Sequence, residues 1–513
     1  MLPSKFSIPS NPLQASFSLL QEAEELRLQR KYSRAEEICE SLLRRYPDYV
    51  AALHSLGLIN LEKSNYQRAF DCLARAAMLN PESWTTLAAL GAVYLRLGAN
   101  EMAVQVLGQA RRLKPQAPSI LAILGEVYDE EREYQLARDA YRQALVLEPD
   151  LLGAAIGLGW ALSDLGEYAE AARIFEDVVK RGVGLDEPVL ALTTLPASVI
   201  SIDLLSALDK IVKNESQDAA EFESSAAFAR AAVLATIGRH AEAWGLVMGA
   251  NQRLFGSMRK ELQPFIQRQD LSMTWARENI VPPVRGAAGD SGPISLFILG
   301  PSRSGKTSME RLVATLDGVK RGYENPIVET SVRRTFQSAR FPTGNQLESL
   351  PVQLHQQFRD KYLQQLASRA GSAMVFTNTH PALIYDAARI AGAIPNVRFI
   401  FMKRDTEDTL LRIYMQKYEK GNPYAYDLKA ARAHIAWCHE MMDLLAAKLP
   451  DIVRVIRYED MVADPVTALR IVANLCGIPM QHGPLPQLGD DRGCAAPYRE
   501  FMASESAKHQ DCH

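Results

Sequence analysis

A 34-residue period runs through the N-terminal half of the sequence. The positions that share it are Pro47, Pro81, Pro115 and Pro149, then Ala35, Ala69, Ala103, Ala137 and Ala171, and the Leu-Gly pairs that begin at Leu56, Leu90, Leu124 and Leu158. A repeat of about this length fits two short helices and a turn. Small residues allow paired helices to approach closely, and each proline ends a second helix. The period therefore predicts helix–turn–helix repeats over residues 15–182.

This pattern resembles the tetratricopeptide repeat. A weaker copy, Ile237-Gly-Arg-His-Ala-Glu-Ala243, aligns with Leu165-Gly-Glu-Tyr-Ala-Glu-Ala171. We therefore expect residues 183–280 to be an irregular helical continuation with a degenerate repeat. Arrays of this kind present a concave surface, so the resemblance implies a protein or peptide partner. The alternative is that the array only scaffolds, orients or dimerises the domain behind it.

A change of composition separates this helical half from the rest of the chain. Residues 281–293 hold three prolines and three glycines without an apolar period, which predicts a linker. A second domain is expected at residues 294–513, because 513 residues exceed the usual size of a single core.

Composition and charge limit the possible compartments and partners. The net charge of -3 gives no signal for nucleic acid. The six cysteines lack metal-ligand spacing, which favours free thiols in a reducing compartment and predicts no metal site. The N-terminus has no secretory pattern, and no stretch of about 18 apolar residues occurs. We therefore expect a cytoplasmic protein without a membrane anchor.

The second domain opens on a candidate anion-binding loop, Gly300-Pro-Ser-Arg-Ser-Gly-Lys-Thr-Ser308. The apolar, β-branched run Ile294–Leu299 before it is typical of a buried strand, and helical apolar spacing follows from Met309. Gly300 and Gly305 allow the backbone to turn tightly near an anion, and a helix that begins near Lys306 directs its N–H groups there. The loop therefore predicts a phosphate or phosphosulfate ligand.

Two patterns fit this loop. As G-x-x-x-x-G-K-T it is a nucleoside-triphosphate P-loop. As Pro-x-Arg-Ser-Gly-x-Thr it resembles the loop with which sulfotransferases hold the 5′-phosphosulfate of 3′-phosphoadenosine 5′-phosphosulfate (PAPS). Apolar runs at residues 373–376, 397–402 and 452–456, each followed by a helical pattern, predict a parallel α/β sheet in either case.

A second segment, Phe399-Ile-Phe-Met-Lys-Arg-Asp405, ends a predicted strand, and Thr406 is expected to cap the helix that follows. The segment resembles the 3′-phosphate region of sulfotransferases. Arg404, Asp405 and Asp408 match that pattern, Thr406 replaces its proline, and Arg412 stands in place of its serine. A guanidinium is a stronger phosphate partner than a hydroxyl, so Arg412 is compatible with a bound 3′-phosphate. The alternative is that Arg412 marks a different nucleotide.

The segments 417–427 and 455–465 are also similar to sulfotransferase segments. Together with the repeats, residues 15 to 480 resemble the bacterial tetratricopeptide-repeat-containing sulfotransferases, and the C-terminal domain is similar to protein-tyrosine sulfotransferases. The resemblance implies an α-solenoid followed by a P-loop-like, parallel-sheet α/β domain that uses PAPS as co-substrate. The acceptor hydroxyl would belong to a protein, a saccharide or a small molecule. The donor-binding residues it implies are Arg303, Ser304, Gly305, Lys306, Thr307, Ser308, Arg404 and Arg412.

The same resemblance suggests a set of catalytic residues. The protein-tyrosine sulfotransferase base corresponds to Glu324 in Arg321-Gly-Tyr-Glu324. The family lysine that serves the leaving group corresponds to Thr379 in Asn378-Thr-His-Pro381, so that cation is missing. We hypothesise that Lys306, which stands where the family has threonine, replaces it. His380 is a second candidate for supplying the proton or the positive charge.

Two alternatives remain at this stage. A P-loop nucleotide hydrolase or kinase would need a strand that ends in an acid for Mg²⁺, but Lys403 and Arg404 follow the strand predicted at residues 397–402. A non-catalytic scaffold with a degenerate sulfotransferase domain is the other alternative. It is suggested by the departures at Thr379 and Arg412 and by residues 489–513, which lack a clear copy of the family's terminal nucleotide-binding segment.

Overall fold

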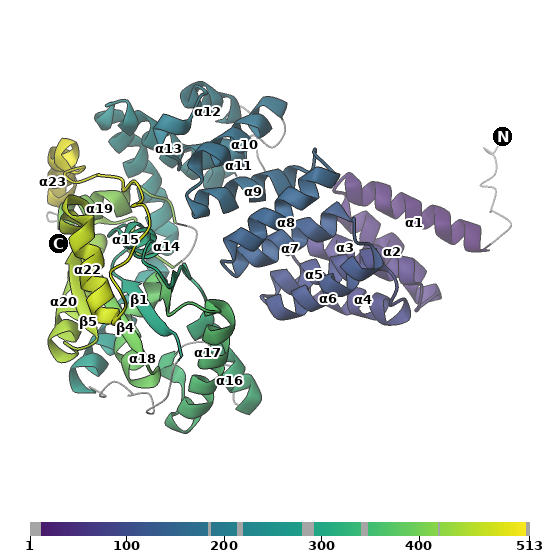
Figure 1. The fold of residues 1–513 in the computed structure, drawn as a ribbon. Coiled ribbons are helices and arrows are strands. Elements are labelled where there is room, and N and C mark those ends of the chain that lie inside the picture. The colour runs from purple at the N-terminus through teal and green to yellow at the C-terminus, as the bar shows by residue number, and fades with distance from the viewer. Residues whose placement is uncertain are drawn as a thin grey trace. The chain divides into compact units, whose positions relative to one another are not determined.

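The computed structural model describes residues 12–182, 186–212, 219–279, 292–339, 347–418 and 421–508. The chain divides into two compact units, Met1–Pro188 and Val189–His513 (Figure 1). Most of the linker predicted at residues 281–293 lies outside the described residues. Across the described segments, no helix is long and apolar enough to span a membrane.

The first unit is a succession of short helices joined by tight turns (Figure 1). These helices are α1 Pro12–Leu28, α2 Tyr32–Arg45, α3 Val50–Glu62, α4 Tyr66–Leu79, α5 Trp84–Arg96, α6 Asn100–Leu113, α7 Pro118–Glu130, α8 Tyr134–Leu147, α9 Leu152–Leu165 and α10 Tyr168–Arg181. Each 34-residue period holds one helix pair, so the predicted repeat array is confirmed.

Glycine and alanine at the repeated positions allow the helices of a pair to meet. The five periodic alanines, beginning with Ala35, are all fully buried. Gly91 on α5 faces the Leu107 side chain of α6, and a Cβ at Gly91 would lie 2.6 Å from a leucine carbon. The equivalent glycines Gly57, Gly125 and Gly159 face Leu73, Tyr141 and Phe175 in the same way. The 34-residue period in the sequence thus reflects close packing between the two helices of each pair.

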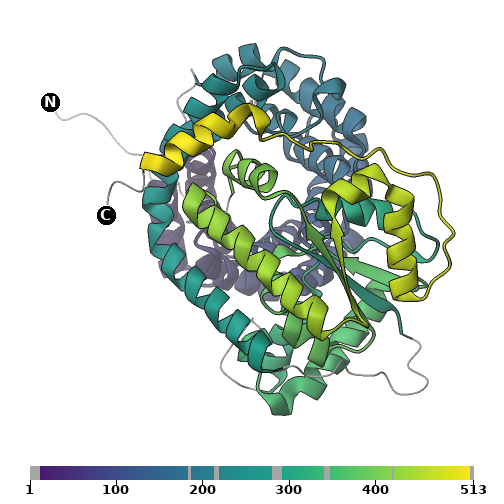
Figure 2. The same cartoon turned by 90° about the vertical axis from the view of Figure 1, so that its left-hand side faces the viewer.

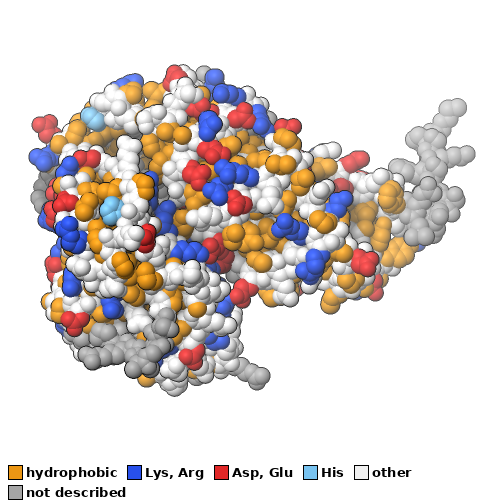
Figure 3. Space-filling model, in the orientation of Figure 1, with side chains coloured by type: hydrophobic (Ala, Val, Ile, Leu, Met, Phe, Trp, Pro, Cys, Tyr) orange, Lys and Arg blue, Asp and Glu red, His pale blue; other side chains and the backbone are white. Residues whose placement is uncertain are grey.

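Ion pairs also connect successive repeats. Arg96 bonds Glu126 at 2.8 Å, and Arg142 bonds Glu170 at 2.8 Å. On the face drawn in Figure 3, acidic and basic side chains are interspersed over these helices rather than gathered by sign. Because such pairs are partly exposed, each contributes only about 0–1 kcal/mol, and the buried apolar core dominates the stability of the array.

Several helices precede the sheet of the second unit, and the first of them crosses the boundary between Pro188 and Val189. They are α11 Asp186–Leu192, η1 Ala197–Val199, α12 Leu204–Val212, α13 Ala219–Thr236 and α14 His240–Glu278, where η marks a 3-10 helix. The weaker repeat copy lies at the turn between α13 and α14, where Gly238 has a φ of +79°. The second helix of this pair, α14, is 39 residues long.

The α13–α14 pair shares a core with residues 410–435 and 495–502 of the same unit. The Trp244 ring of α14 lies 5.2 Å from the Tyr414 ring and stacks on Phe501 at 6.2 Å. Asn251 donates a hydrogen bond to the Tyr414 carbonyl oxygen at 2.9 Å. Figure 2 shows α14 running beside α20, which spans Leu428–Lys448. Residues 219–278 therefore pack as part of the second unit.

A five-stranded parallel sheet forms the centre of the second unit, in the order β2-β3-β1-β4-β5. The strands are β1 Ile294–Leu299, β2 Val319–Lys320, β3 Val375–Asn378, β4 Val397–Lys403 and β5 Val453–Arg457. The helices around them are α15 Lys306–Val313, α16 Ile327–Ala339, η2 Leu347–Ser349, η3 Val352–Leu354, α17 His355–Ala370, η4 Pro381–Ile384, α18 Ala387–Ala393, α19 Thr406–Tyr414, α20 Leu428–Lys448, α21 Tyr458–Ala463, α22 Pro465–Cys476, η5 Ala496–Tyr498 and α23 Arg499–Lys508. The predicted parallel α/β domain is confirmed.

Alternating strand residues fill two separate apolar layers. Phe297 of β1 and Phe399 of β4 stack at 5.5 Å on one face, which α16, α17, α18 and α20 cover. Ile298 and Ile400 lie on the other face, under α15 and α22 (Figure 2). A sheet covered on both faces explains why its strands appear in the sequence as continuous apolar runs.

The elements around the loop begin where the sequence predicts, with one correction. β1 coincides with the predicted strand, and α15 begins at Lys306. The prediction that Thr406 caps α19 is wrong. Asp405 is the cap, because its backbone is not helical, with a ψ of 134°, and its side chain accepts the Asp408 N–H at 3.0 Å, while Thr406 is already helical.

Candidate functional site

The loop between β1 and α15 turns through left-handed backbone conformations. Arg303 has a φ of +64° and Gly305 a φ of +93°. A Cβ at Gly305 would lie 2.4 Å from the Tyr458 ring, so only glycine fits there. No side chain caps α15, and its first N–H groups face the loop. This is the backbone geometry that suits an anion.

Two polar side chains of the loop are buried. The Ser304 hydroxyl has no hydrogen-bond partner among the described residues. Lys306 donates to the carbonyl oxygens of Pro301 at 2.9 Å and Gly300 at 3.2 Å. Burial lowers the pKa of Lys306 to about 8, although the Glu324 carboxylate opposes that shift. The ammonium group is therefore held by weak neutral acceptors, which an anion can replace.

The remaining loop residues lie nearer the surface. Arg303 and Thr307 are exposed, and Ser308 is half-buried on the first turn of α15. The Arg303 carbonyl oxygen accepts a hydrogen bond from Arg404 at 3.3 Å. The loop after β1 is thus tied directly to the residue that follows β4.

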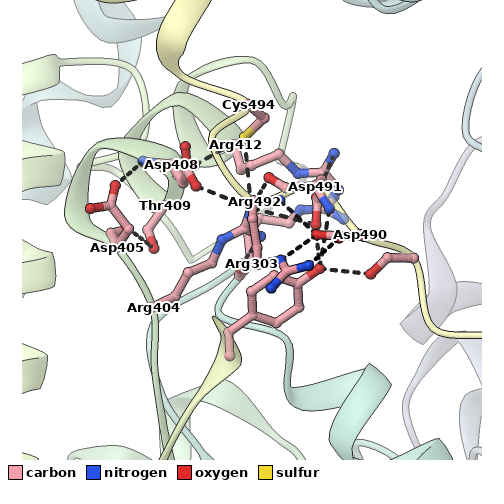
Figure 4. Close-up of polar contacts among 12 residues, drawn as sticks. Arg303, Arg404, Asp405, Asp408, Thr409, Arg412, Asp490, Asp491, Arg492 and Cys494 are labelled. Carbon is pink, nitrogen blue, oxygen red and sulfur yellow. Dashed lines mark hydrogen bonds and ion pairs between the residues drawn. The ribbon is translucent and has the colours of Figure 1, made fainter. Parts of the chain in front are cut away.

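Arg404 is the central cation of this edge of the sheet (Figure 4). Its side chain is 2% exposed, and its guanidinium lies 4.4 Å from the centre of the Tyr458 ring. One terminal nitrogen donates to the Asp491 carbonyl oxygen at 2.8 Å. Its Nε has no partner in the part of the chain that the structure describes. A buried guanidinium with an unused donor is a suitable phosphate contact.

Arg412 reaches the same place from α19. Its guanidinium lies 3.2 Å from one carboxylate oxygen of Asp491, and Arg404 lies 3.5 Å from the other. The Tyr458 hydroxyl donates to that carboxylate as well. Burial alone would raise the pKa of Asp491, but the charges of Arg412 and Arg404 lower it. Asp491 is therefore an ionised carboxylate between both cations (Figure 4).

Asp491 belongs to a C-terminal strap, which we define as residues 489–495. Asp408 holds this strap by accepting the Gly493 N–H at 2.7 Å and the Ala495 N–H at 2.9 Å. The Gly489 carbonyl oxygen accepts from the Tyr458 hydroxyl at 2.8 Å. The strap thus crosses the carboxyl ends of β4 and β5 with its backbone bonded at several points.

A buried carboxylate, Glu310, supports the segment that carries Glu324. Glu310 pairs with Arg321 at 3.3 Å, accepts the Tyr323 N–H at 2.8 Å and accepts the Thr377 hydroxyl at 2.5 Å. The Thr379 N–H donates to the Tyr323 carbonyl oxygen at 2.9 Å. These bonds fix residues 321–324 against the end of β3.

The candidate catalytic residues occupy different surroundings. Glu324 is exposed and close enough to Lys306 to act on its pKa. The His380 Nδ1 atom lies 3.7 Å from a Glu329 oxygen and has no hydrogen-bond partner in the described segments. Thr379 is buried and bonded through its backbone. Glu324 therefore lies near Lys306, and His380 lies near Glu329.

Carboxylates that a nucleotide hydrolase would need for Mg²⁺ have other partners here. Asp405 caps α19, and Glu459 accepts the Asp405 N–H at 2.8 Å. Lys403 pairs with Asp443 at 2.6 Å. Among the described ranges no group of three or more His, Cys, Asp or Glu is placed to hold a metal ion. The expected lack of a metal site stays a prediction.

Three residues of this site did not emerge from the sequence. Tyr458 lies within the similar segment at residues 455–465, so its position was visible although its role was not. Glu310 has the spacing of an ordinary helix residue. Asp491 lies in a tail without a recognisable pattern, and only the folded chain shows that it meets two arginines.

The fold is that of a parallel α/β domain with a glycine-containing loop after its first strand, preceded in the chain by helical repeats. Residues 293–482 match the model of the sulfotransferase family, and residues 20–85 and 88–151 match that of the tetratricopeptide repeat. The chain therefore combines tetratricopeptide repeats with a sulfotransferase-family domain, as the sequence motifs predicted. Among curated proteins, none matches the chain.

Several solved structures resemble part of the chain, among them two tetratricopeptide-repeat proteins. A thermophilic tetratricopeptide-repeat protein of Thermus thermophilus is 22% identical, with 36% of this chain and 98% of that chain covered and a TM-score of 0.32. A repeat protein of Parabacteroides merdae is 17% identical, with 47% and 93% covered and a TM-score of 0.35. MamA of Desulfovibrio magneticus is 19% identical, with 33% and 97% covered and a TM-score of 0.29. These scores are too low to support further argument.

Proposed function

We propose that the second unit transfers a sulfuryl group from PAPS to a hydroxyl of a protein, saccharide or small-molecule acceptor. The observation that carries this proposal is the pair of buried cations, Lys306 and Arg404, at the ends of neighbouring parallel strands. A donor with phosphates at both its 5′ and 3′ positions matches two such cations. The sulfotransferase-family match supports the same conclusion.

The residues present fit such a donor. Ser304 and Arg404 each have a buried polar atom without a partner in the described chain, and both atoms lie at the loop edge of the sheet. On the 5′ side we assign the backbone and side chains of residues 303–308. On the 3′ side we assign Arg404 and Arg412. When bound, PAPS supplies an activated sulfuryl group on its 5′-phosphate.

The proposed chemistry uses two side chains of this domain. Glu324 accepts the proton of the acceptor hydroxyl while the acceptor oxygen forms a bond to sulfur. The bond between sulfur and the phosphate oxygen breaks, and its electron pair remains on that oxygen. Lys306 neutralises the charge that develops there. The products are a sulfate ester and 3′-phosphoadenosine 5′-phosphate. His380 is the alternative proton or charge donor, and its contact with Glu329 keeps it near the end of β3.

Nucleotide binding tests the proposal directly. Isothermal titration should show binding of 3′-phosphoadenosine 5′-phosphate and no binding of ATP with Mg²⁺. The reverse result would support the P-loop hydrolase or kinase. Binding of neither nucleotide would support a non-catalytic scaffold.

The role of Lys306 needs its own comparison. Lys306→Ala should lower kcat about 10²- to 10³-fold, the usual effect of removing one group that stabilises transition-state charge. Arg303→Ala serves as the comparison, because it removes another donor-binding residue of the same loop. If Lys306→Ala kept full turnover while Arg303→Ala lost it, Lys306 would not be the replacement for the missing cation.

We also propose that the repeat array recruits a protein partner or substrate, since tetratricopeptide repeats generally mediate protein contacts. Removal of residues 1–188 should then raise KM for a macromolecular acceptor and leave a small phenol unaffected. An equal change for both acceptors would favour a purely structural role of the array.

A further inference from the structure

The site contains its own anion. Asp491 lies between the two guanidinium groups that we assign to the 3′-phosphate, at 3.2 Å from Arg412 and 3.5 Å from Arg404. The carboxylate also accepts the Tyr458 hydroxyl. No other carboxylate in the described chain is recorded within 4 Å of both guanidiniums. A phosphate that approached the same donors would meet a negative charge already in place.

We propose that Asp491 is a specificity-determining residue that competes with the 3′-phosphate of the donor for Arg404 and Arg412. This inference rests on the proposed sulfotransferase function. A nucleotide that carries the 3′-phosphate displaces the Asp491 carboxylate, whereas a nucleotide without it leaves Asp491 in place. Asp491 thereby sets the affinity for nucleotides that carry the 3′-phosphate and leaves the affinity for nucleotides without it unchanged.

The larger charge of the 3′-phosphate favours its replacement of the Asp491 carboxylate on the two arginines. A phosphate monoester carries about −1.5 to −2 charges and three acceptor oxygens, against one charge and two oxygens for Asp491. Two guanidiniums bond such a group with more hydrogen bonds than they use on the carboxylate. Arg404 also keeps one unused buried donor in the present arrangement. The 3′-phosphate therefore displaces Asp491, and a weaker anion does not.

Displacement of Asp491 also affects the strap. The Gly493 and Ala495 N–H groups bond to Asp408, which neighbours Arg404 at 4.0 Å. The Asp491 carbonyl oxygen accepts from Arg404. A ligand that pulls Arg404 and Arg412 away from Asp491 loosens these backbone bonds. Movement of residues 489–495 is therefore an observable consequence of 3′-phosphate binding.

The first test is Asp491→Asn in the full-length chain, which keeps the side-chain shape and removes the charge. The affinity for 3′-phosphoadenosine 5′-phosphate should rise about tenfold, because both arginines lose their internal partner. The affinity for AMP, which lacks the 3′-phosphate, should not change. Asp490→Asn is the matched control. It removes the same charge one residue earlier, where Asp490 pairs with Arg492 instead, so it should have little effect.

The second test uses the wild-type chain and does not depend on a variant that folds. Hydrogen exchange at the Gly493 and Ala495 amides should become faster with 3′-phosphoadenosine 5′-phosphate and stay unchanged with AMP. Slower exchange, or weaker binding by Asp491→Asn, would show that the strap helps to hold the nucleotide and would overturn the inference. If the wild-type chain and Asp491→Asn bound 3′-phosphoadenosine 5′-phosphate equally, the competition between Asp491 and the 3′-phosphate would be refuted and the proposed function would stand. If neither bound it, the proposed function would fail as well.

Discussion

The charge of Lys306 changes near neutral pH because its side chain is buried among neutral acceptors. Burial lowers its pKa from 10.5 to about 8, so the unfolded chain binds more protons than the folded one between these values. Its burial therefore costs stability below pH about 8, and this cost shrinks as the pH rises toward 10.5. The same residue is in its charged form only below pH about 8, which is the form that the proposed reaction needs.

A pH profile follows from this charge state. kcat/KM for sulfuryl transfer should fall as the pH rises through about 8, because Lys306 loses the proton that neutralises the leaving group. Lys306→Arg keeps a positive charge at all these pH values and should abolish this decline even if its overall rate is lower. If kcat/KM of Lys306→Arg still fell with the same midpoint pH, the decline would belong to another titrating group.

Substitution of Glu310 should lower the stability of the domain, whereas substitution of Glu324 should lower its turnover. Glu310→Gln breaks a buried pair with Arg321, so the free energy of unfolding in urea should drop by roughly 3–5 kcal/mol. Glu324→Gln changes an exposed side chain and should leave unfolding unchanged while it removes the proposed base. Equal stability of both variants would contradict the supporting role of Glu310. Full turnover of Glu324→Gln would contradict the role of Glu324 as base.

The sequence allowed prediction of those site residues that lie in contiguous motifs. The loop after β1 and Arg404 after β4 were found because a strand end and a cation or glycine pattern are local properties. Asp491 was not found, because its role depends on a contact between residues 87 positions apart, as the Arg404 bond shows. No local pattern encodes which tail residue will cross which strand end.

At the scale of the helix, small residues decide how the repeats pack. Gly91→Ala should destabilise the first unit by about 1–3 kcal/mol, because the new Cβ would overlap the Leu107 side chain at 2.6 Å. Gly108→Ala is the matched control. It lies in the interior of α6, and its nearest neighbour would be the tip of Arg112 at 4.0 Å. Greater helix propensity should make Gly108→Ala neutral or stabilising by up to about 1 kcal/mol.

Thermal or urea unfolding of the two variants checks this prediction. A loss of stability in both would mean that any alanine disturbs these helices. No loss in Gly91→Ala would mean that α5 and α6 can move apart, and that the period reflects something other than close helix contact.

Element boundaries show what the pattern of apolar residues encodes. β1, β4 and β5 lie within one or two residues of their predicted ranges because both faces of the sheet are buried. β2 is only two residues long and gave no signal. The cap of α19 was placed one residue late, because Asp405 and Thr406 are both good capping residues and only the backbone angles distinguish them.

At the scale of the whole molecule, periodicity identifies helices without saying which core they join. The repeat-like turn at Gly238 suggested continuation of the array. The buried faces of α13 and α14 meet α19, η5 and α23, where Trp244 contacts Tyr414 and Phe501. A helix pair with one apolar face packs on whatever apolar surface the rest of the chain offers, and that surface is distant in sequence.

Truncation tests which residues the second unit needs. A fragment that begins at Val189 keeps α13 and α14 and should unfold cooperatively and bind 3′-phosphoadenosine 5′-phosphate with the affinity of the full chain. A fragment that begins at Gly292 retains the whole sulfotransferase-family match but exposes the apolar faces of Tyr414 and Phe501. It should aggregate or lose its cooperative transition, because a large exposed apolar patch is an aggregation site.

A point variant tests the same contacts in the full-length chain. The free energy of unfolding of Trp244→Ala should fall by about 3–5 kcal/mol. Size-exclusion chromatography and circular-dichroism melting distinguish these outcomes. A monomeric fragment from Gly292 with an unchanged melting temperature would show that α13 and α14 are dispensable to the domain.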